Sequence, residues 1–320
     1  MIKVERVDCP NLLKWNEIPQ KEGEIETRDS ILFFNDISNH NSKYQKMGIR
    51  GARIKESYSA YSDKTVRKVL KEMFNGKCAY CESKISAIYN GDIEHFRPKG
   101  GYNDMSGQPL INPGYYWLAS EWENLLFACP FCNQTNTQEI FDGINTREVV
   151  QGKLNQFPLL TNTYRLNYND GNNYINDKSE YEKAFNLEES ERLLLKPCTD
   201  IDVEKHFKYD DLGLIYKNAG LNSLEENRAE TSIKVYALQR LGLIQTRKEK
   251  VIQIKAQIRR VEQALLNYNK YLDKSEEENI WFEGILRDEM KILKAFKNSD
   301  QEYAGLARYI IEKYFNAFII

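Results

Sequence analysis

Two short cysteine pairs frame the stretch that decides the fold, Cys78-Ala79-Tyr80-Cys81 and Cys129-Pro130-Phe131-Cys132-Asn133, and between them runs Asp92-Ile93-Glu94-His95-Phe96-Arg97-Pro98. Each Cys-x-x-Cys turn can present two sulfur atoms to one ion, and four thiolates match the tetrahedral geometry that Zn²⁺ prefers. We therefore predict one structural zinc ion held by Cys78, Cys81, Cys129 and Cys132. The two pairs are separated by 47 residues, more than in a zinc ribbon, so the insert has room for a hairpin and a helix.

The insert contains an acidic residue followed directly by a histidine. Residues 92–98 predict a short strand that turns at Pro98, because proline lacks the N–H of a strand ladder and fixes its own φ. Glu94 and His95 then stand at the strand end. Phosphodiester hydrolysis needs a base that is neutral near pH 7 and a metal ion held by oxygen ligands, and this pair suits both needs. The alternative is that both are ordinary surface residues beside a zinc knuckle.

The order of these residues resembles the HNH endonuclease superfamily. Its pattern runs Cys-x-x-Cys, acidic-His-x-x-Pro, Asn-Leu, and Cys-x-x-Cys followed by His or Asn. The resemblance implies a ββα-metal fold in which His95 is the general base and Glu94 with Asn133 binds a catalytic Mg²⁺ or Mn²⁺. It also implies that Asn124 braces the loop that holds the base. Glu94 stands where Asp is usual and Asn133 where His is usual, but both keep oxygen donors, which suit a hard cation.

The sequence is similar, more closely, to the HNH subunit of Septu-type (PtuB-like) anti-phage systems, which also occur with some retrons. This resemblance rests on residues 93–99 and 116–126, and together with the cysteine pairs it covers residues 78–133. It implies a partner ATPase of the PtuA type. The sequence has no Walker motif, so any ATP dependence is expected to come from that partner.

A basic stretch precedes the first cysteine pair. The net charge of the chain is −2, which argues against a nucleic-acid binder, but residues 43–77 hold ten basic and three acidic residues, a balance of +7. Their second part predicts a helix capped by Ser62 or Asp63, with the basic residues mostly opposite an apolar face. We predict that Arg67 and Lys71 of this helix contact phosphates. The alternative is a solvated basic helix.

Two further basic residues follow the predicted base. Arg97 and Lys99 lie close enough in sequence to His95 to hold the scissile phosphate, because both carry donors that bind phosphate oxygens. We therefore include them among the predicted substrate-binding residues.

The sequence predicts an α+β protein, with a zinc-stapled ββα-metal (HNH) module embedded in a mainly α-helical chain. We expect an N-terminal helical and basic segment at 1–70, the module at 71–160, a linker or loop region at 161–200, and a C-terminal helical domain at 201–320. Asn and Tyr residues at 161–176 favour a loop or hairpin, and helical periodicity beyond residue 233 favours a bundle. The apolar residues of 309–320 belong either to the core or to an interface, and His206 is expected at the surface.

The composition of the chain limits the cellular compartments and the functions that we expect for it. Six cysteines in 320 residues are too few for a disulfide scaffold, and neither a secretory start nor a membrane-length apolar run is present. We expect a cytoplasmic protein with no membrane contact. The predicted function is metal-dependent cleavage of nucleic acid, DNA in preference to RNA, as the nuclease subunit of an anti-phage complex. Two alternatives remain: a non-catalytic zinc-containing adaptor or nucleic-acid-binding subunit, and a ribonuclease on the same fold.

Overall fold

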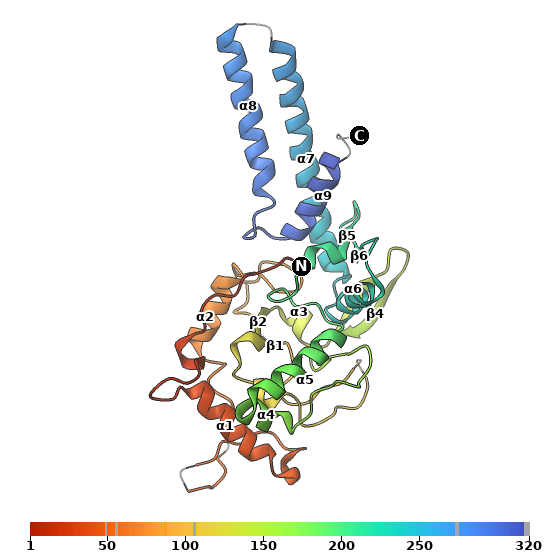
Figure 1. Cartoon of the computed structure of the whole chain (residues 1–320). Helices are drawn as coiled ribbons and strands as arrows, with labels where there is room; N and C mark the ends of the chain where they lie inside the picture. Colours follow the sequence, from red (N-terminus) through yellow and green to blue (C-terminus); the bar gives the residue numbers. More distant parts are fainter. Residues whose placement is uncertain (49, 55–56, 87, 105–106, 273–274, 317–320) are drawn as a thin grey trace.

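The computed structural model describes residues 1–48, 50–54, 57–86, 88–104, 107–272 and 275–316. A rounded body carries a projecting pair of long helices (Figure 1). The strands among the described residues form three separate two-stranded antiparallel sheets among the helices, so the predicted α+β class is confirmed. The helices are α1 (Glu22–Phe34), α2 (Lys64–Met73), α3 (Pro130–Asn133), α4 (Asp170–Asn176), α5 (Lys178–Glu191), α6 (Ser223–Val235), α7 (Leu241–Tyr271), α8 (Glu276–Ala295) and α9 (Ala304–Asn316). The strands are β1 (Asp92–His95), β2 (Leu125–Ala128), β3 (Asn136–Phe141), β4 (Thr146–Gln151), β5 (Phe207–Tyr209) and β6 (Ile215–Lys217).

The sheet of β1 and β2 lies in the body and carries the acidic-histidine pair. The strands are antiparallel, with Glu94 opposite Leu126 and His95 opposite Leu125. Every residue of β2 is buried, whereas β1 is buried only in its second half, at Glu94 and His95. α3 follows β2 directly and begins with Pro130. Proline is favourable there because the N–H of the first helical residue makes no hydrogen bond within the helix, so its absence costs nothing. Strand, strand and short helix therefore succeed one another around the site.

α2 is the predicted basic helix, and it packs against β2. The side chain of Asp63 accepts a hydrogen bond from the backbone N–H of Thr65, which caps the helix as the sequence predicts. Val66 and Leu70 are fully buried, while the basic side chains lie on the outer part of the helix. Lys55, which belongs to the predicted basic stretch, lies outside the described residues.

The linker predicted at 161–200 is wrong in its larger part, because this region forms α4 and α5. α5 begins where the side chain of Asp177 accepts a hydrogen bond from the N–H of Glu180. It is anchored by Glu188, which accepts hydrogen bonds from Tyr115 and Arg97, 73 and 91 positions earlier in the chain. Local composition does not reveal this helix, since the contacts that anchor it come from distant residues.

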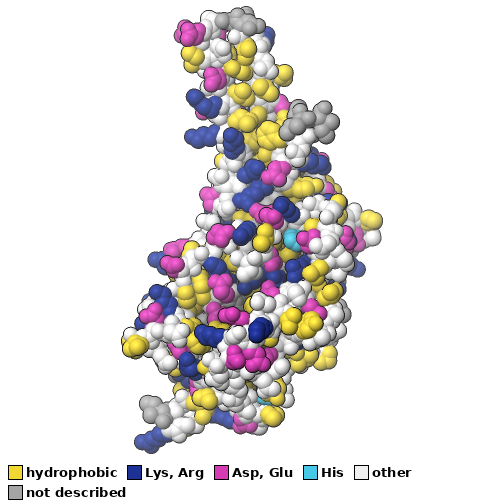
Figure 2. Space-filling model, viewed as in Figure 1, with side chains coloured by type: hydrophobic (Ala, Val, Ile, Leu, Met, Phe, Trp, Pro, Cys, Tyr) yellow, Lys and Arg dark blue, Asp and Glu magenta, His cyan; other side chains and the backbone are white. Residues whose placement is uncertain are grey.

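The C-terminal region forms a two-helix arm. α7 and α8 pack antiparallel, and α9 lies along the base of α7 (Figure 1). The arm buries Val251, Ile254 and Ile258, in agreement with the predicted helical periodicity. Apolar and basic side chains are interspersed on the surface of the arm, where Leu266 and Trp281 are exposed (Figure 2).

Two further expectations concern the C-terminal region. α9 buries Leu306 and Ile311, so this part of the apolar segment belongs to the core, while Phe318, Ile319 and Ile320 lie outside the described residues. The expected surface position of His206 is wrong: it is buried because it leads into β5, whose Phe207 is part of the core. Among the described residues, no helix has a stretch both long and apolar enough to cross a bilayer.

Candidate metal and catalytic site

The four predicted zinc ligands come together in the structure. Cys78, Cys81, Cys129 and Cys132 are all buried, and their Sγ atoms lie within 4.8 Å of one another. Cys81 Sγ is 3.8 Å from Cys129 Sγ. A Zn–S bond of about 2.3 Å places the sulfurs of a tetrahedral site roughly 3.8 Å apart, so the cluster fits a zinc ion without large rearrangement.

Arg240 completes the surroundings of the cluster. Its Nη1 lies 3.4 Å from Cys132 Sγ and its Nη2 lies 4.0 Å from Cys129 Sγ. Four thiolates on one Zn²⁺ carry a net negative charge, which the guanidinium offsets while its N–H groups orient the sulfurs. The sequence did not place Arg240 at the cluster, because 108 positions separate it from Cys132 in the chain.

One face of β1 presents two carboxylates. Asp92 and Glu94 share this face, because alternate residues of a strand point to the same side. Asp92 Oδ2 accepts hydrogen bonds from Asn133 Nδ2 at 2.9 Å and from Gln134 Nε2 at 3.0 Å. A carboxylate only accepts, so the nitrogen of the Asn133 amide must face Asp92, and its oxygen Oδ1 stays available for a cation. Asp92 is a site residue that the sequence reasoning did not single out.

Glu94 is a buried carboxylate whose charge is offset from within the protein. Its Oε1 lies 2.7 Å from the ammonium of Lys153 and accepts no aligned hydrogen bond from the described residues. Burial raises the pKa of Glu94, and the Lys153 ammonium opposes that rise. β1 and α3 pack together, so the Glu94 carboxylate and the Asn133 amide lie on neighbouring elements, and oxygen donors of these two kinds suit a hard divalent cation.

His95 is held as a neutral base. Its Nε2 lies 2.9 Å from the carbonyl oxygen of Ala119, and because that oxygen only accepts, Nε2 must carry the proton. The lone pair is therefore on Nδ1, which lies 3.4 Å from Lys99 Nζ. Burial, and secondarily the Lys99 ammonium, hold the pKa of His95 well below its usual value. The ring of Tyr61 packs edge-on against the imidazole, with 4.4 Å between ring centroids.

The Asn124 side chain hydrogen-bonds the backbone of two segments, one just after His95 and one before β2. Its Oδ1 accepts from the N–H of Arg97 at 2.8 Å, and its Nδ2 donates to the carbonyl oxygens of Arg97 at 3.0 Å and Leu118 at 3.1 Å. One amide thus ties the backbone just after His95 to the segment that precedes β2.

Arg97 does not face solvent, contrary to the predicted phosphate contact. It is 1 % exposed, and its guanidinium pairs with Glu188 at 2.7 Å and with Glu189 at 2.5 Å. A phosphate would have to displace two carboxylates from a buried position, which is costly for all the charges involved. Arg97 therefore anchors α5 to the site rather than presenting a phosphate ligand.

The remaining predicted substrate-binding residues lie at different distances from His95. Lys99 is half-buried beside the imidazole, with its ammonium 4.6 Å from the centroid of the Tyr61 ring. Arg67 donates a hydrogen bond to the carbonyl oxygen of Gly91, the residue just before β1, so α2 reaches the oxygen-bearing face. Lys71 lies one turn further along α2, and no side-chain contact joins it to the site among the described residues.

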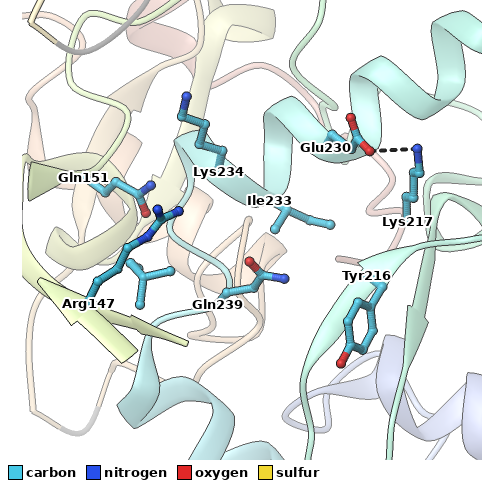
Figure 3. A pocket seen from close by; sticks show the side chains of 9 residues that line it. Arg147, Gln151, Tyr216, Lys217, Glu230, Ile233, Lys234 and Gln239 are labelled. Atoms are coloured by element: carbon cyan, nitrogen blue, oxygen red, sulfur yellow. Dashed lines mark ion pairs between the residues drawn. The ribbon is translucent and has the colours of Figure 1, made fainter. Parts of the chain in front are cut away.

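The surface pockets found among the described residues are not lined by Glu94 or His95. One, of about 380 Å³, lies between the β3–β4 hairpin and α6, where Arg147 and Gln151 line one side and the ion pair of Lys217 with Glu230, 2.7 Å long, lines the other (Figure 3). None of the predicted site residues lines it. Glu94 and His95 are themselves buried, at 4 % and 7 % exposed.

No protein-family model matches this chain. The chain is 39 % identical to the Septu protein PtuB of Bacillus mycoides (strain KBAB4) over 191 residues, which make up 59 % of this chain and 52 % of PtuB. It is also 28 % identical to the Septu protein PtuA of the same strain over 184 residues, 57 % of this chain and 20 % of PtuA. The matches thus span about half the length of PtuB and a fifth of the length of PtuA.

Proposed function

We propose that this chain is a metal-dependent HNH endonuclease that hydrolyses phosphodiester bonds of nucleic acid, DNA in preference to RNA. The observation that carries the proposal is the neutral His95, with a defined basic nitrogen, next to the oxygen ligands of β1 and α3. The β1–β2–α3 order and the four cysteines beside it support the assignment to the HNH superfamily.

In this mechanism His95 is the general base. Nδ1 takes a proton from the attacking water, while the carbonyl oxygen of Ala119 keeps the Nε2 proton in place and stabilises the imidazolium that forms. Lys99, whose Nζ is 3.4 Å from Nδ1, holds a phosphate oxygen beside the base. Asn124 keeps this geometry by fixing the backbone of Arg97, two residues after His95.

Glu94 and Asn133 would hold the divalent ion, Mg²⁺ or Mn²⁺, which neutralises charge on the scissile phosphate and the leaving oxygen when it is bound. Asp92 orients the amide of Asn133 for this purpose. The four cysteines would hold the structural zinc ion, which fixes Asn133 because this residue directly follows Cys132.

We further propose that the chain is the nuclease subunit of a Septu-type anti-phage defence system that acts with a partner ATPase. The similarity to the Septu proteins PtuB and PtuA supports this assignment. This sequence has no Walker motif, so the proposal places ATP hydrolysis in a separate chain.

The test is a nicking assay on supercoiled DNA with Mg²⁺ or Mn²⁺, with and without the proposed PtuA-type partner ATPase, and with structured RNA in parallel. His95→Ala should lower the cleavage rate by about 10² to 10⁴, as expected for loss of a positioned base. His40→Ala is a matched control, because the His40 Nε2 also lies 3.0 Å from a carbonyl oxygen, that of Phe34. Cleavage by His95→Ala at the wild-type rate would favour the adaptor alternative, and cleavage of RNA alone would favour the ribonuclease.

A further inference from the structure

The segment just after β4 is tied to the second cysteine pair. The N–H of Lys153 donates to the carbonyl oxygen of Cys132 at 2.9 Å, and the N–H of Leu154 donates to that of Asn133 at 2.6 Å. Residues 152–154 therefore run beside the knuckle that carries the fourth cysteine and the predicted ligand Asn133.

The side chain of Lys153 extends from this segment to the acidic-histidine pair. Its Nζ lies 2.7 Å from Glu94 Oε1 and donates to the carbonyl oxygen of His95 at 2.9 Å. One residue thus connects the cysteine knuckle to both members of the pair, through its backbone on one side and its ammonium on the other.

Both side chains of the Lys153–Glu94 ion pair are buried. The Lys153 side chain is 0 % exposed, whereas that of Glu94 is 6 % exposed. The ammonium and the carboxylate therefore meet inside the protein, away from bulk solvent. A buried carboxylate without a partner is strongly disfavoured, so the ammonium is what keeps Glu94 in this position.

We propose that Lys153 is a positioning residue for the divalent-metal site: it holds the Glu94 carboxylate in place and in register with Asn133. This inference rests on the proposed function, because it takes Glu94 and Asn133 as the ligands. Groups that orient metal ligands typically change metal affinity by about 10- to 100-fold when they are removed. Loss of the Lys153 ammonium therefore weakens the binding of Mn²⁺ by this amount and leaves the zinc content unchanged.

The experiment measures Mn²⁺ binding to the full chain by electron paramagnetic resonance and calorimetry, with zinc content and cleavage measured on the same samples. Lys153→Met should weaken Mn²⁺ binding by about 10- to 100-fold, and Lys153→Arg, which keeps a cation, should recover most of the affinity. Lys196→Met is the matched control, because Lys196 is also buried but its ammonium lies over the ring of Phe96 rather than on Glu94. If Lys153→Met does not fold, Lys153→Gln, which keeps a donor and loses the charge, takes its place.

The outcomes separate this inference from the proposed function. A wild-type chain that binds Mn²⁺ and cleaves no nucleic acid contradicts the nuclease proposal, while the affinity of Lys153→Met still decides the role of the lysine. Unchanged or tighter Mn²⁺ binding by Lys153→Met, or by Lys153→Gln in its place, overturns the positioning role. So does a wild-type chain that binds no Mn²⁺, or an Arg variant as weak as the Met variant.

Discussion

Gly152 and the carbonyl oxygen of Gln134 approach so closely that a Cβ on Gly152 would lie 1.8 Å from that oxygen. Gly152 also has a φ of +139°, a conformation that L side chains rarely adopt. This approach allows residues 152–154 to lie against the knuckle. The requirement for glycine is therefore set by backbone contact and not by a turn alone.

Gly152→Ala should lower the free energy of unfolding by about 3 kcal/mol or more, since steric overlap and backbone strain each cost on the order of 1 to 3 kcal/mol. Urea denaturation followed by circular dichroism measures the change. Gly284→Ala is the control: a Cβ on Gly284, which lies within α8, would meet no atom within 4 Å, so alanine should stabilise by about 0.5 to 1 kcal/mol. Equal effects of the two substitutions would contradict the close approach.

Removal of a zinc ligand should prevent folding of the module. Structural zinc contributes on the order of 10 to 16 kcal/mol in small modules, comparable to the about 5 to 15 kcal/mol net stability of a typical domain. We expect Cys81→Ser to be insoluble or locally unfolded, and to contain less than one zinc ion per chain by elemental analysis. Cys198→Ser, at a buried cysteine outside the cluster, should keep its zinc. Folded wild-type protein that contains no zinc by elemental analysis would contradict this prediction.

Charge reversal on α2 should weaken nucleic-acid binding across all sequences. Arg67→Glu with Lys71→Glu removes two predicted phosphate contacts, and each lost contact reduces the slope of log K against log salt by about 0.9 for duplex DNA. Titrations at several salt concentrations measure both the affinity and the slope. Lys291→Glu with Lys294→Glu makes the same charge change on α8, a helix of the C-terminal arm, and serves as the control. If both double variants bind alike, α2 does not contact phosphates.

The buried Lys196 should make the free energy of unfolding rise with pH between about 8 and 10.5. Burial lowers its pKa from 10.5 to about 8, so the folded protein holds this charge at a cost at any pH below 8. Between pH 8 and 10.5 the unfolded chain binds more protons at Lys196 than the folded chain, so the wild-type protein gains stability as the pH rises. Lys196→Met should therefore stabilise by about 3 kcal/mol at pH 7, and the gain should vanish near pH 10.5. Denaturation midpoints across this range measure it, and a gain that does not vary with pH would contradict the assignment.

Local patterns predicted the parts of the fold that depend on short-range contacts. The spacing of the cysteine pairs predicted the cluster, Pro98 marked the turn after β1, and Asp63 with the apolar spacing predicted α2. These features are readable from the sequence because each is determined by residues close together in the chain, or by a metal-ligand pattern with few alternatives.

Long-range pairing was not predictable in the same way. Lys153 meets His95 across 58 positions, and Arg97 meets Glu188 across 91. A buried lysine or arginine has the same appearance in a sequence as an exposed one, so Arg97 was taken for a phosphate ligand and Lys153 was overlooked. Their positions follow from tertiary packing, which pairs each cation with a carboxylate that local patterns do not identify.

Arg240 is one of several residues that join the base of the arm to the cysteine cluster and its flanking segments: Lys77 donates to the carbonyl oxygens of Ser299 and Gln301, and Ser83 shares a hydrogen bond with Tyr303. Arg240 is the N-cap of α7 and also contacts the sulfurs of Cys129 and Cys132. With 31 residues, α7 is a rod of about 46 Å at 1.5 Å per residue. Any displacement of this rod relative to the body (Figure 1) must therefore be accommodated at these contacts, and the Arg240 contact lies on the knuckle whose next residue is Asn133.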